Sequence, residues 1–347
     1  MHLTQDGAKE LETAASLRPR DDSIWYALGN FRDSLDDSEG ALSAYDQAVR
    51  FAPYYAHTNW QRGNLKLRMG RYSEAFSEMR LAASKNENLL PTFIDLALGV
   101  SRGDLSLAQQ LIQVSNDKQR LALARMLATK GRGEDSLKQL SLLKIALTTD
   151  AKQELVRQLI ASKSYHEAYE LWTSNSDNKD SPAVVDGGFE GSLTTNNKGF
   201  GWRFSTGEQK VELSQDAAEH QAGTRSLRIN FIGNATPGNL LLSQFVVVGP
   251  DQTYRINYAV KSRNVVSGGP PVITVDDLDT GETLGKSEPF PESTSGWQSA
   301  SFTFTTRSKS KAVMLGLRRN YCSSSPCPIF GVIWLDSFSI EPIATTK

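Results

Sequence analysis

The stretch DDSIWYALGNFRDSLDDSEGALSAYDQAVRFAP, residues 21–53, contains two amphipathic segments on either side of a short polar turn. Its apolar residues recur at spacings of three and four, which is the period of an α-helix. Gly29, Ala41 and Ala48 are small enough to let two antiparallel helices approach closely, and Pro53 ends the second helix. The stretch therefore predicts a hairpin of two packed helices.

The same stretch resembles a tetratricopeptide repeat, a unit of about 34 residues that stacks into a solenoid. The positions that match the repeat are Trp25, Leu28, Gly29, Ala41, Tyr45, Ala48 and Pro53. A second copy keeps the small residues Gly63, Ala75 and Ala82. It has Asn59 and Arg62 where the first copy has Trp and Leu, so it is a degraded repeat.

Polar turns before Ala- or Ser-containing helix starts recur further along the chain, at residues 69–79, 101–111, 129–140 and 161–171. Their spacing is that of stacked helical hairpins, so residues 1–173 predict an all-α solenoid. When the repeat pattern is extended toward the amino terminus by one unit, residues 6–19 correspond to the second helix of a repeat whose first helix is missing. We therefore expect the chain to be a fragment of a longer protein whose preceding part carries more repeats and any targeting signal.

The first helices of the two clearest repeats would line the concave groove of such a solenoid. By the phase of the repeat, the groove residues are Tyr26, Asn30, Asp33, His57, Trp60 and Asn64. This mixture of aromatic, amide and charged groups suits an extended peptide or a helix of a protein partner. The alternative is that Tyr26 and Trp60 only pack against neighbouring helices.

The charge balance of the 347 residues argues against some classes of partner. There are 38 Lys and Arg against 39 Asp and Glu, a formal net charge of −1, so no general basic field would attract nucleic acid. No apolar run approaches the roughly 20 residues that cross a bilayer, and the first residues lack the pattern of a signal peptide. We therefore expect no nucleic-acid partner and no membrane span in this chain.

The pattern changes after residues 174–182, a polar segment with a Pro at its end that predicts a linker. From 183 to 343, short runs of β-branched and aromatic residues are separated by Gly, Pro, Asp and Ser clusters. Strands are predicted at 240–248, 253–262, 271–275, 299–307, 312–319 and 331–340, with others near 200–205, 209–213 and 226–231. Strands at this spacing, without helices between them, predict an all-β antiparallel sandwich.

Six segments of this region, taken in order, resemble the jelly-roll carbohydrate-binding modules of families four, nine and twenty-two. They are DGGFE (186–190), GFGW (199–202), HQAGTRSLRI (220–229), YRINYAVKS (254–262), GWQSASFTFTT (296–306) and IWLDSFSI (333–340). The resemblance implies a jelly-roll module, over about residues 183–343, that binds a polysaccharide or oligosaccharide. Modules of this kind usually lack catalytic activity.

The resemblance also implies a structural calcium ion between the first and last strands. Its ligands would be the carboxylates of Glu190 and Asp336, a carbonyl of Gly188 and the loop from Gln221 to Arg225. Ca²⁺ takes six to eight oxygen ligands, and such an ion would close the sandwich. The alternative is that backbone amides alone satisfy the two carboxylates.

Sugar contacts would come from side chains further along the sandwich. The residues that we expect to contact the sugar are Arg255, Asn257, Arg318, Tyr321 and Trp334. A guanidinium at a strand end can bind a hydroxyl or an acidic group, and rings beside an irregular loop can stack on a sugar. The alternatives are an ordinary surface charge at Arg318 and core packing of Tyr321 and Trp334.

The two cysteines, Cys322 and Cys327, lie close together across a Ser- and Pro-rich loop. They predict a local disulfide and therefore an oxidising compartment, which would be the periplasm, the cell surface or the outside of the cell. Two reduced thiols are the alternative.

Three functions are compatible with these features. We favour a glycan-binding module carried on a protein-binding solenoid, in an envelope or extracellular polysaccharide system. The second is a pure interaction scaffold with a structural sandwich, and the third is a jelly-roll polysaccharide lyase or glycosidase. Catalysis needs convergent acids and bases, but the sandwich has one His, His220, and Asp276, Asp277 and Asp279 cluster at a predicted hairpin turn. We therefore expect a binding protein rather than an enzyme.

Overall fold

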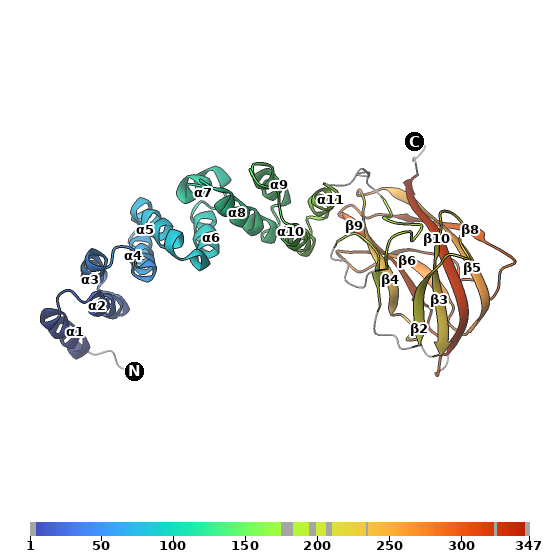
Figure 1. Ribbon diagram of the computed structural model, residues 1–347, viewed down its shortest axis with the longest axis horizontal. Coiled ribbons are helices and arrows are strands. Elements are labelled where there is room, and N and C mark those ends of the chain that lie inside the picture. The colour runs from blue at the N-terminus through green and yellow to red at the C-terminus, as the bar shows by residue number, and fades with distance from the viewer. Residues whose placement is uncertain are drawn as a thin grey trace. The chain divides into compact units, whose positions relative to one another are not determined.

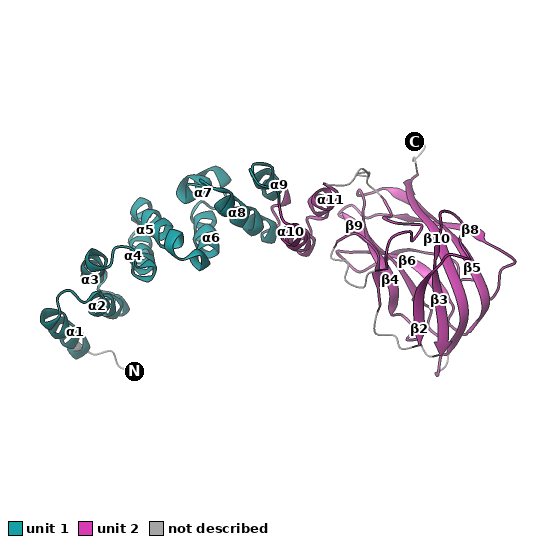
Figure 2. Ribbon diagram, in the orientation of Figure 1, with its two compact units in different colours: residues 1–130, 135–146 teal, residues 131–134, 147–347 magenta. Residues whose placement is uncertain are grey.

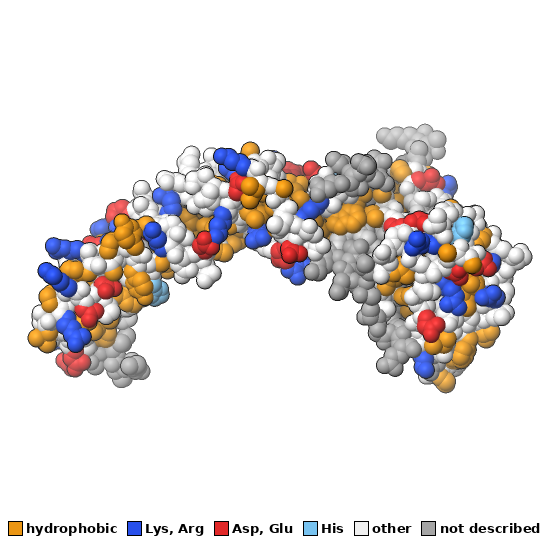
Figure 3. Space-filling model, in the orientation of Figure 1, with side chains coloured by type: hydrophobic (Ala, Val, Ile, Leu, Met, Phe, Trp, Pro, Cys, Tyr) orange, Lys and Arg blue, Asp and Glu red, His pale blue; other side chains and the backbone are white. Residues whose placement is uncertain are grey.

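The computed structural model describes residues 5–174, 183–193, 199–205, 210–233, 235–322 and 325–343. The chain divides into two compact units, one of residues 1–130 and 135–146, the other of residues 131–134 and 147–347 (Figure 2). Among the described residues, no helix is long and apolar enough to cross a membrane. Lys, Arg, Asp and Glu side chains are interspersed over the face seen in Figure 3, in keeping with the net charge of −1.

Eleven α-helices follow one another in the described part of the chain before the first strand (Figure 1). They are α1 (Gln5–Leu17), α2 (Asp22–Ser34), α3 (Ser38–Phe51), α4 (Ala56–Arg68), α5 (Tyr72–Lys85), α6 (Leu90–Val100), α7 (Leu105–Ile112), α8 (Asp117–Thr129), α9 (Gly133–Ser141), α10 (Thr149–Ala161) and α11 (Tyr165–Thr173), with a 3₁₀ helix, η1 (Glu87–Leu89), before α6. The polar turns expected from the sequence separate α4 from α5, α6 from α7, α8 from α9 and α10 from α11. The predicted all-α region is therefore confirmed.

The hairpin of α2 and α3 shows why small residues recur in the pattern. Gly29 in α2 lies against Tyr45 in α3, so that a Cβ added to Gly29 would stand 2.5 Å from the ring. Tyr45 is buried, and its hydroxyl donates a 2.7 Å hydrogen bond to Oδ1 of Asn30. Asp21 and Asp37 accept backbone N–H bonds at the starts of α2 and α3 and thereby cap both helices.

In the next hairpin, α4 and α5, polar contacts replace the apolar ones. Asn59 is fully buried, and its side-chain amide donates a 3.0 Å hydrogen bond to the carbonyl of Pro53. Arg62 forms ion pairs with Asp46 of α3 and Glu78 of α5. The departure from the repeat pattern at Asn59 and Arg62 is thus matched by new hydrogen bonds and ion pairs, and the hairpin still forms.

Ten strands form the sandwich in the described residues. They are β1 (Arg203–Phe204), β2 (Val211–Asp216), β3 (Ser226–Gly233), β4 (Leu240–Val247), β5 (Thr253–Ser267), β6 (Pro271–Asp277), β7 (Thr283–Lys286), β8 (Gln298–Thr305), β9 (Ala312–Arg319) and β10 (Ile329–Pro342). Sheet A has the order β1-β4-β9-β6-β7, and sheet B has the order β2-β3-β10-β5-β8. Neighbouring strands are antiparallel, and the inner faces of the two sheets share one apolar core. The predicted all-β sandwich is confirmed, and only β7 was not expected.

The second unit contains α10 and α11 as well as the sandwich. The rings of Tyr169 and Trp172 in α11 lie 5.2 and 6.0 Å, between centroids, from the ring of Phe200. The hydroxyl of Tyr165 donates a 3.2 Å hydrogen bond to Asp279. The predicted linker, 174–182, lies outside the described residues apart from Ser174, so the boundary expected there stays a prediction.

Candidate functional site

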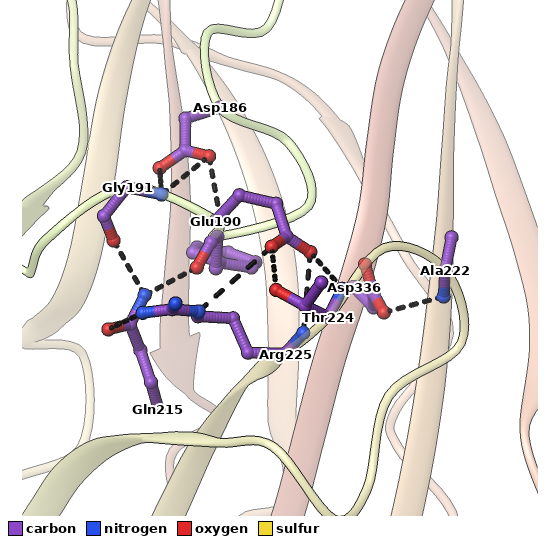
Figure 4. A network of polar contacts seen from close by, with 9 residues as sticks. Asp186, Glu190, Gly191, Gln215, Ala222, Thr224, Arg225 and Asp336 are labelled. Atoms are coloured by element: carbon purple, nitrogen blue, oxygen red, sulfur yellow. Dashed lines mark hydrogen bonds and ion pairs between the residues drawn. The ribbon is translucent and has the colours of Figure 1, made fainter.

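Glu190 and Asp336 lie near each other and hold the same loop, residues 221–225 (Figure 4). Glu190 accepts hydrogen bonds from the backbone N–H and the hydroxyl of Thr224, at 2.8 and 2.6 Å. Asp336 is fully buried, and its Oδ2 accepts the backbone N–H groups of Gln221 and Ala222 at 2.7 and 3.1 Å. We call Glu190, Asp336 and residues 221–225 the carboxylate clasp.

The hydrogen bonds of Thr224 to Glu190 hold the pKa of that carboxyl below its usual value. Glu190 comes before β1 and Asp336 lies in β10, so the clasp ties the first described segment of the sandwich to its last strand. The structure thus brings Glu190 and Asp336 to the same loop, as the family resemblance implied, while their role as calcium ligands stays a prediction. Their neighbour Gly188 also lies there, since a Cβ added to it would stand 3.6 Å from Oδ1 of Asp336.

The groups that surround the two carboxylates of the clasp do not match those of a calcium site. Ca²⁺ needs six to eight oxygens, whereas N–H and O–H groups point at these carboxylates. Arg225 adds a cation, with its Nε 4.0 Å from Glu190. Within the described ranges, no group of three or more His, Cys, Asp or Glu side chains could hold a metal. The calcium ion stays a prediction from the sequence.

The five residues expected to contact sugar do not meet in one place. Arg318 lies on β9 of sheet A, and Tyr321 follows that strand with 79% of its surface exposed. Arg255 and Asn257 lie on β5 and Trp334 on β10, both strands of sheet B. The expected sugar contacts are thus divided between the two sheets.

Trp334 is not available as a stacking platform, because the residue is 1% exposed. The indole Nε1–H donates a 2.9 Å hydrogen bond to Asp216. The cationic groups of Lys261 and Arg263 lie 5.8 and 5.0 Å from the ring centroid. Trp334 is therefore a packing residue, which was the alternative to a sugar contact. It packs on the outer face of sheet B and not in the core.

The two β5 residues have partners of their own. Arg255 forms a 3.5 Å ion pair with Glu341, which is also 3.3 Å from the side-chain amide of Asn257. Asn257 lines a surface pocket of about 360 Å³ together with Ser301 and Ser337. These residues form a polar patch on sheet B, away from Arg318.

A row of side chains on the outer face of sheet A carries stronger signs of a binding site. The registers pair Arg203 of β1 with Ser243 of β4, Ser243 with Gly316 of β9, Gly316 with Thr274 of β6, and Thr274 with Lys286 of β7. Residues next to them, such as Leu242, Ile273 and Leu317, belong to the core. Because side chains alternate along a strand, the five paired residues lie on the face of sheet A away from the core, although Ser243, Gly316 and Thr274 are buried there. We call them the sheet A row.

Three buried polar atoms at this face have no hydrogen-bond partner. They are Nη1 of Arg203, Oγ1 of Thr274 and Nε of Arg318. Arg318 pairs in register with Val272 but forms an ion pair with Asp276, so its side chain extends past Thr274. A buried polar atom without a partner costs about 1–3 kcal/mol, and nearly all such atoms in proteins are satisfied. Six other buried polar atoms in the described residues also lack a partner, but these three share one face of the sandwich.

The remaining contacts define the chemistry of the face. Asp276 accepts a 2.6 Å hydrogen bond from the hydroxyl of Thr283 in addition to its ion pair with Arg318. The guanidinium of Arg203 lies over the ring of Phe245, with its Cζ 3.7 Å from the centroid. Burial lowers the pKa of Arg203 to about 10. The face thus offers hydroxyl, carboxylate and guanidinium groups beside an aromatic ring.

Of the three unpartnered groups, only Arg318 was expected from the sequence. Alternation within PVITV already placed Thr274 opposite Ile273 and Val275, so its outward position could have been predicted. Nothing in the sequence around Arg203 separates it from an ordinary surface arginine.

The predicted disulfide is present between Cys322 and Cys327, whose Cα atoms are 5.7 Å apart. Next to it, Arg319 is 1% exposed and donates hydrogen bonds to the carbonyl of Gly269 at 3.2 Å and to the hydroxyl of Ser267 at 2.8 Å. This arginine therefore holds loops together at the end of sheet A.

The predicted groove residues of the helical part are only partly available. Trp60 is 9% exposed and packs in an apolar cluster, which corrects its assignment to the groove. Asp33 pairs with Arg68. The rings of Tyr26 and His57 lie 5.1 Å apart and connect α2 with α4. Asn30 and Asn64 are partly exposed on the same two helices.

Comparisons with known proteins find a family-model match and similar solved structures. Residues 181–318 match the family model described as a carbohydrate binding domain. A solved structure of a CBM4 module is 16% identical and covers 46% of this chain and 99% of its own, with a TM-score of 0.34. The CBM22-1 xylan-binding domain of Paenibacillus barcinonensis Xyn10C is 17% identical and covers 47% and 96%, with a TM-score of 0.29.

The protein YrrB, described as a tetratricopeptide-repeat protein with an unusual peptide-binding site, is 18% identical. That match covers 47% of this chain and 89% of YrrB, with a TM-score of 0.28. A comparison with curated proteins finds no match. The chain joins a region of successive α-helices to a β-sandwich, and residues 181–318 match the family model of a carbohydrate binding domain.

Proposed function

We propose that the β-sandwich binds a glycan on the outer face of sheet A, around the sheet A row. The observation that carries the proposal is the group of three unpartnered buried polar atoms, on Arg203, Thr274 and Arg318. A glycan presents hydroxyl groups that both donate and accept hydrogen bonds, so successive sugar rings along the face can pair with these groups. The match of residues 181–318 to a carbohydrate-binding family supports the same ligand class.

The same face favours binding over catalysis. Hydrolysis of a glycosidic bond usually needs two carboxyl groups that flank the bond. Asp276, the carboxylate described at this face, is already held by Arg318 and Thr283. We infer that Asp276 orients the Arg318 guanidinium toward the sugar and takes no part in a reaction.

A screen of the full chain against immobilised polysaccharides, followed by titration of the binders, tests the proposal. Thr274→Val removes a hydroxyl with little change of shape, and Arg318→Ala removes the guanidinium. We expect each to weaken binding about 10- to 100-fold, since a lost hydrogen bond to a charged or buried group costs about 1.5–3 kcal/mol.

The matched control is Arg255→Ala, the same change on sheet B. It should leave the affinity unchanged, because Arg255 lies on the other sheet and pairs with Glu341. Loss of binding in Arg255→Ala with normal binding in Arg318→Ala would move the site to the sheet B patch and contradict the proposal.

We further propose that the helical part binds a protein segment along α2 and α4. The partly exposed Tyr26, the exposed His57 and the partly exposed Asn64 lie on these helices and offer aromatic and amide groups to a peptide. Panning a random peptide library on the full chain tests this. Selected peptides should lose affinity for a Tyr26→Ala/His57→Ala variant, and equal binding to both proteins would reject this surface.

We propose an oxidising compartment as the place of action, in the handling of extracellular or envelope polysaccharide. The support is the Cys322–Cys327 disulfide. Alkylation of the protein directly in its native cells, followed by mass spectrometry, should find both cysteines protected. Two alkylated thiols would place the protein in a reducing compartment.

A further inference from the structure

Arg203 is a partly buried cation without a counter-charge in the described part of the chain. Its Nη2 donates a 2.6 Å hydrogen bond to the carbonyl of Gly199, and Nη1 is buried without a partner. No carboxylate among the described residues forms an ion pair with it. Arg318 on the same face differs, because Asp276 neutralises it.

Such an arrangement is costly. Removing a guanidinium from water without pairing it with an anion loses hydration that hydrogen bonds to neutral groups replace only in part. The ring of Phe245, 3.7 Å from the Cζ of Arg203, compensates for some of this loss through a cation–π contact. The burial that lowers the pKa of Arg203 to about 10 still leaves the group protonated at neutral pH.

The charge is also placed at one end of the row that the proposed glycan would cover. Between Arg203 and Lys286 the row contains only Ser243, Gly316 and Thr274, which carry no charge. Five strands at the usual spacing make the row about 19 Å wide. The residues at both ends of the row are therefore cationic, and the guanidinium of Arg203 reaches over Phe245 of β4, although the whole chain has a net charge of −1.

We propose that the glycan bound by the sheet A row is acidic, and that a carboxylate or sulfate group of the sugar is the missing partner of Arg203. This inference rests on the proposed function of the face. An anionic oxygen at Nη1 would complete the hydrogen bonds of Arg203 and neutralise its charge in one contact, and charge-assisted bonds of this kind are about twice as strong as neutral ones. A neutral sugar would complete the hydrogen bond and leave the charge uncompensated.

The experiment compares acidic polysaccharides with their neutralised forms, using the full chain and affinity electrophoresis or calorimetry. One pair is polygalacturonate and its carboxyl-reduced product, and another is a sulfated galactan and its desulfated product. We expect binding to one of the acidic polymers, with at least tenfold weaker binding to its neutralised form. The pair that responds identifies the anion as carboxylate or sulfate.

Variants of Arg203 assign the effect to this residue. Arg203→Gln should weaken binding of the acidic polymer at least tenfold and remove most of the preference over the neutralised form. Arg203→Lys should restore part of the preference, because it returns the charge without the planar guanidinium. Arg255→Gln, a surface arginine on sheet B, should behave as the unmodified chain.

Two results would overturn the inference and leave the proposed function standing. Equal binding of acidic and neutralised polymers, lost in Arg318→Ala, would leave the glycan site in place and show that its ligand is neutral. Full affinity of Arg203→Gln for the acidic polymer would show that Arg203 is not the anion partner. If neither form of any tested polymer binds, the proposed function itself fails together with this inference.

Discussion

If Arg203 is held in place to bind an acidic group of the glycan, its unpaired charge should lower the stability of the protein without glycan. Replacing it by Met keeps a chain that can lie on Phe245 and removes the unpaired charge. We expect Arg203→Met to raise the melting temperature of the sandwich in the absence of glycan, since replacing an uncompensated buried charge with an apolar group is often stabilising.

Thermal unfolding followed by circular dichroism measures this effect. Arg255→Met, which loses an exposed ion pair with Glu341, is the control and should change little. A clear fall in the melting temperature of Arg203→Met would show that the guanidinium stabilises the fold and is not held there for a ligand.

The lowered pKa of Glu190 predicts that the stability of the sandwich depends on pH. Its pKa is lowered in the folded protein, first by the side-chain hydrogen bond from Thr224, so folding favours the ionised carboxylate. That contribution is present above the unfolded pKa, about 4.3, and is lost as the pH falls through the lower folded value. The melting temperatures of the unmodified chain and of Glu190→Gln should therefore differ at neutral pH and converge below about pH 4. A difference that does not change with pH would exclude this role.

At the scale of the elements, the α2–α3 hairpin depends on a close approach. Gly29→Ala would place a Cβ 2.5 Å from the buried ring of Tyr45. We expect it to lower the free energy of unfolding by about 1–3 kcal/mol, because the two helices have to move apart. Urea unfolding provides the measurement.

Gly99→Ala in α6 is the matched control, since nothing lies within 4 Å of a Cβ added there. Alanine is the better helix former by about 1 kcal/mol, so this variant should be neutral or more stable. If the two substitutions have the same effect, close packing is not the reason for Gly29.

In the sandwich, the carboxylate clasp holds separate segments together, as the close contact of α2 and α3 does in the helical part. Asp336→Asn keeps the shape of the side chain, but its amide has only one acceptor oxygen. The N–H groups of Gln221, Ala222 and Ser337 then compete for it, which should cost about 1–3 kcal/mol. Calcium titration of the unmodified chain separates the two interpretations of the clasp, because a bound ion raises the melting temperature and a clasp of hydrogen bonds alone does not respond.

At the scale of the whole molecule, the two compact units have separate cores. We therefore expect two transitions in differential scanning calorimetry. Gly29→Ala should lower one of them and Asp336→Asn the other, and a bound glycan should raise only the transition that Asp336→Asn lowers. A single transition that both variants shift would show that the units unfold together.

Local patterns along the chain were sufficient to predict both classes of structure. The spacing of Trp25, Gly29 and Tyr45 determined a helical hairpin, and the alternation in LLLSQFVVV and PVITV determined strands. These predictions succeed because the periods of helix and strand are set by the backbone within a few residues. The meeting of Glu190 with Asp336 and the Cys322–Cys327 bond were also expected, the first from a family resemblance and the second from spacing.

Only the tertiary structure decided which outward-facing residues meet. Arg203, Thr274 and Arg318 come from three strands and share one face because β1, β4, β9 and β6 lie side by side in sheet A. Trp334 was expected to be open to a sugar, but Lys261 and Arg263 of the neighbouring strand cover it. Alternation along a strand predicts that a side chain points away from the core. Strand order and register decide which side chains lie beside it, and both depend on contacts between distant segments of the chain.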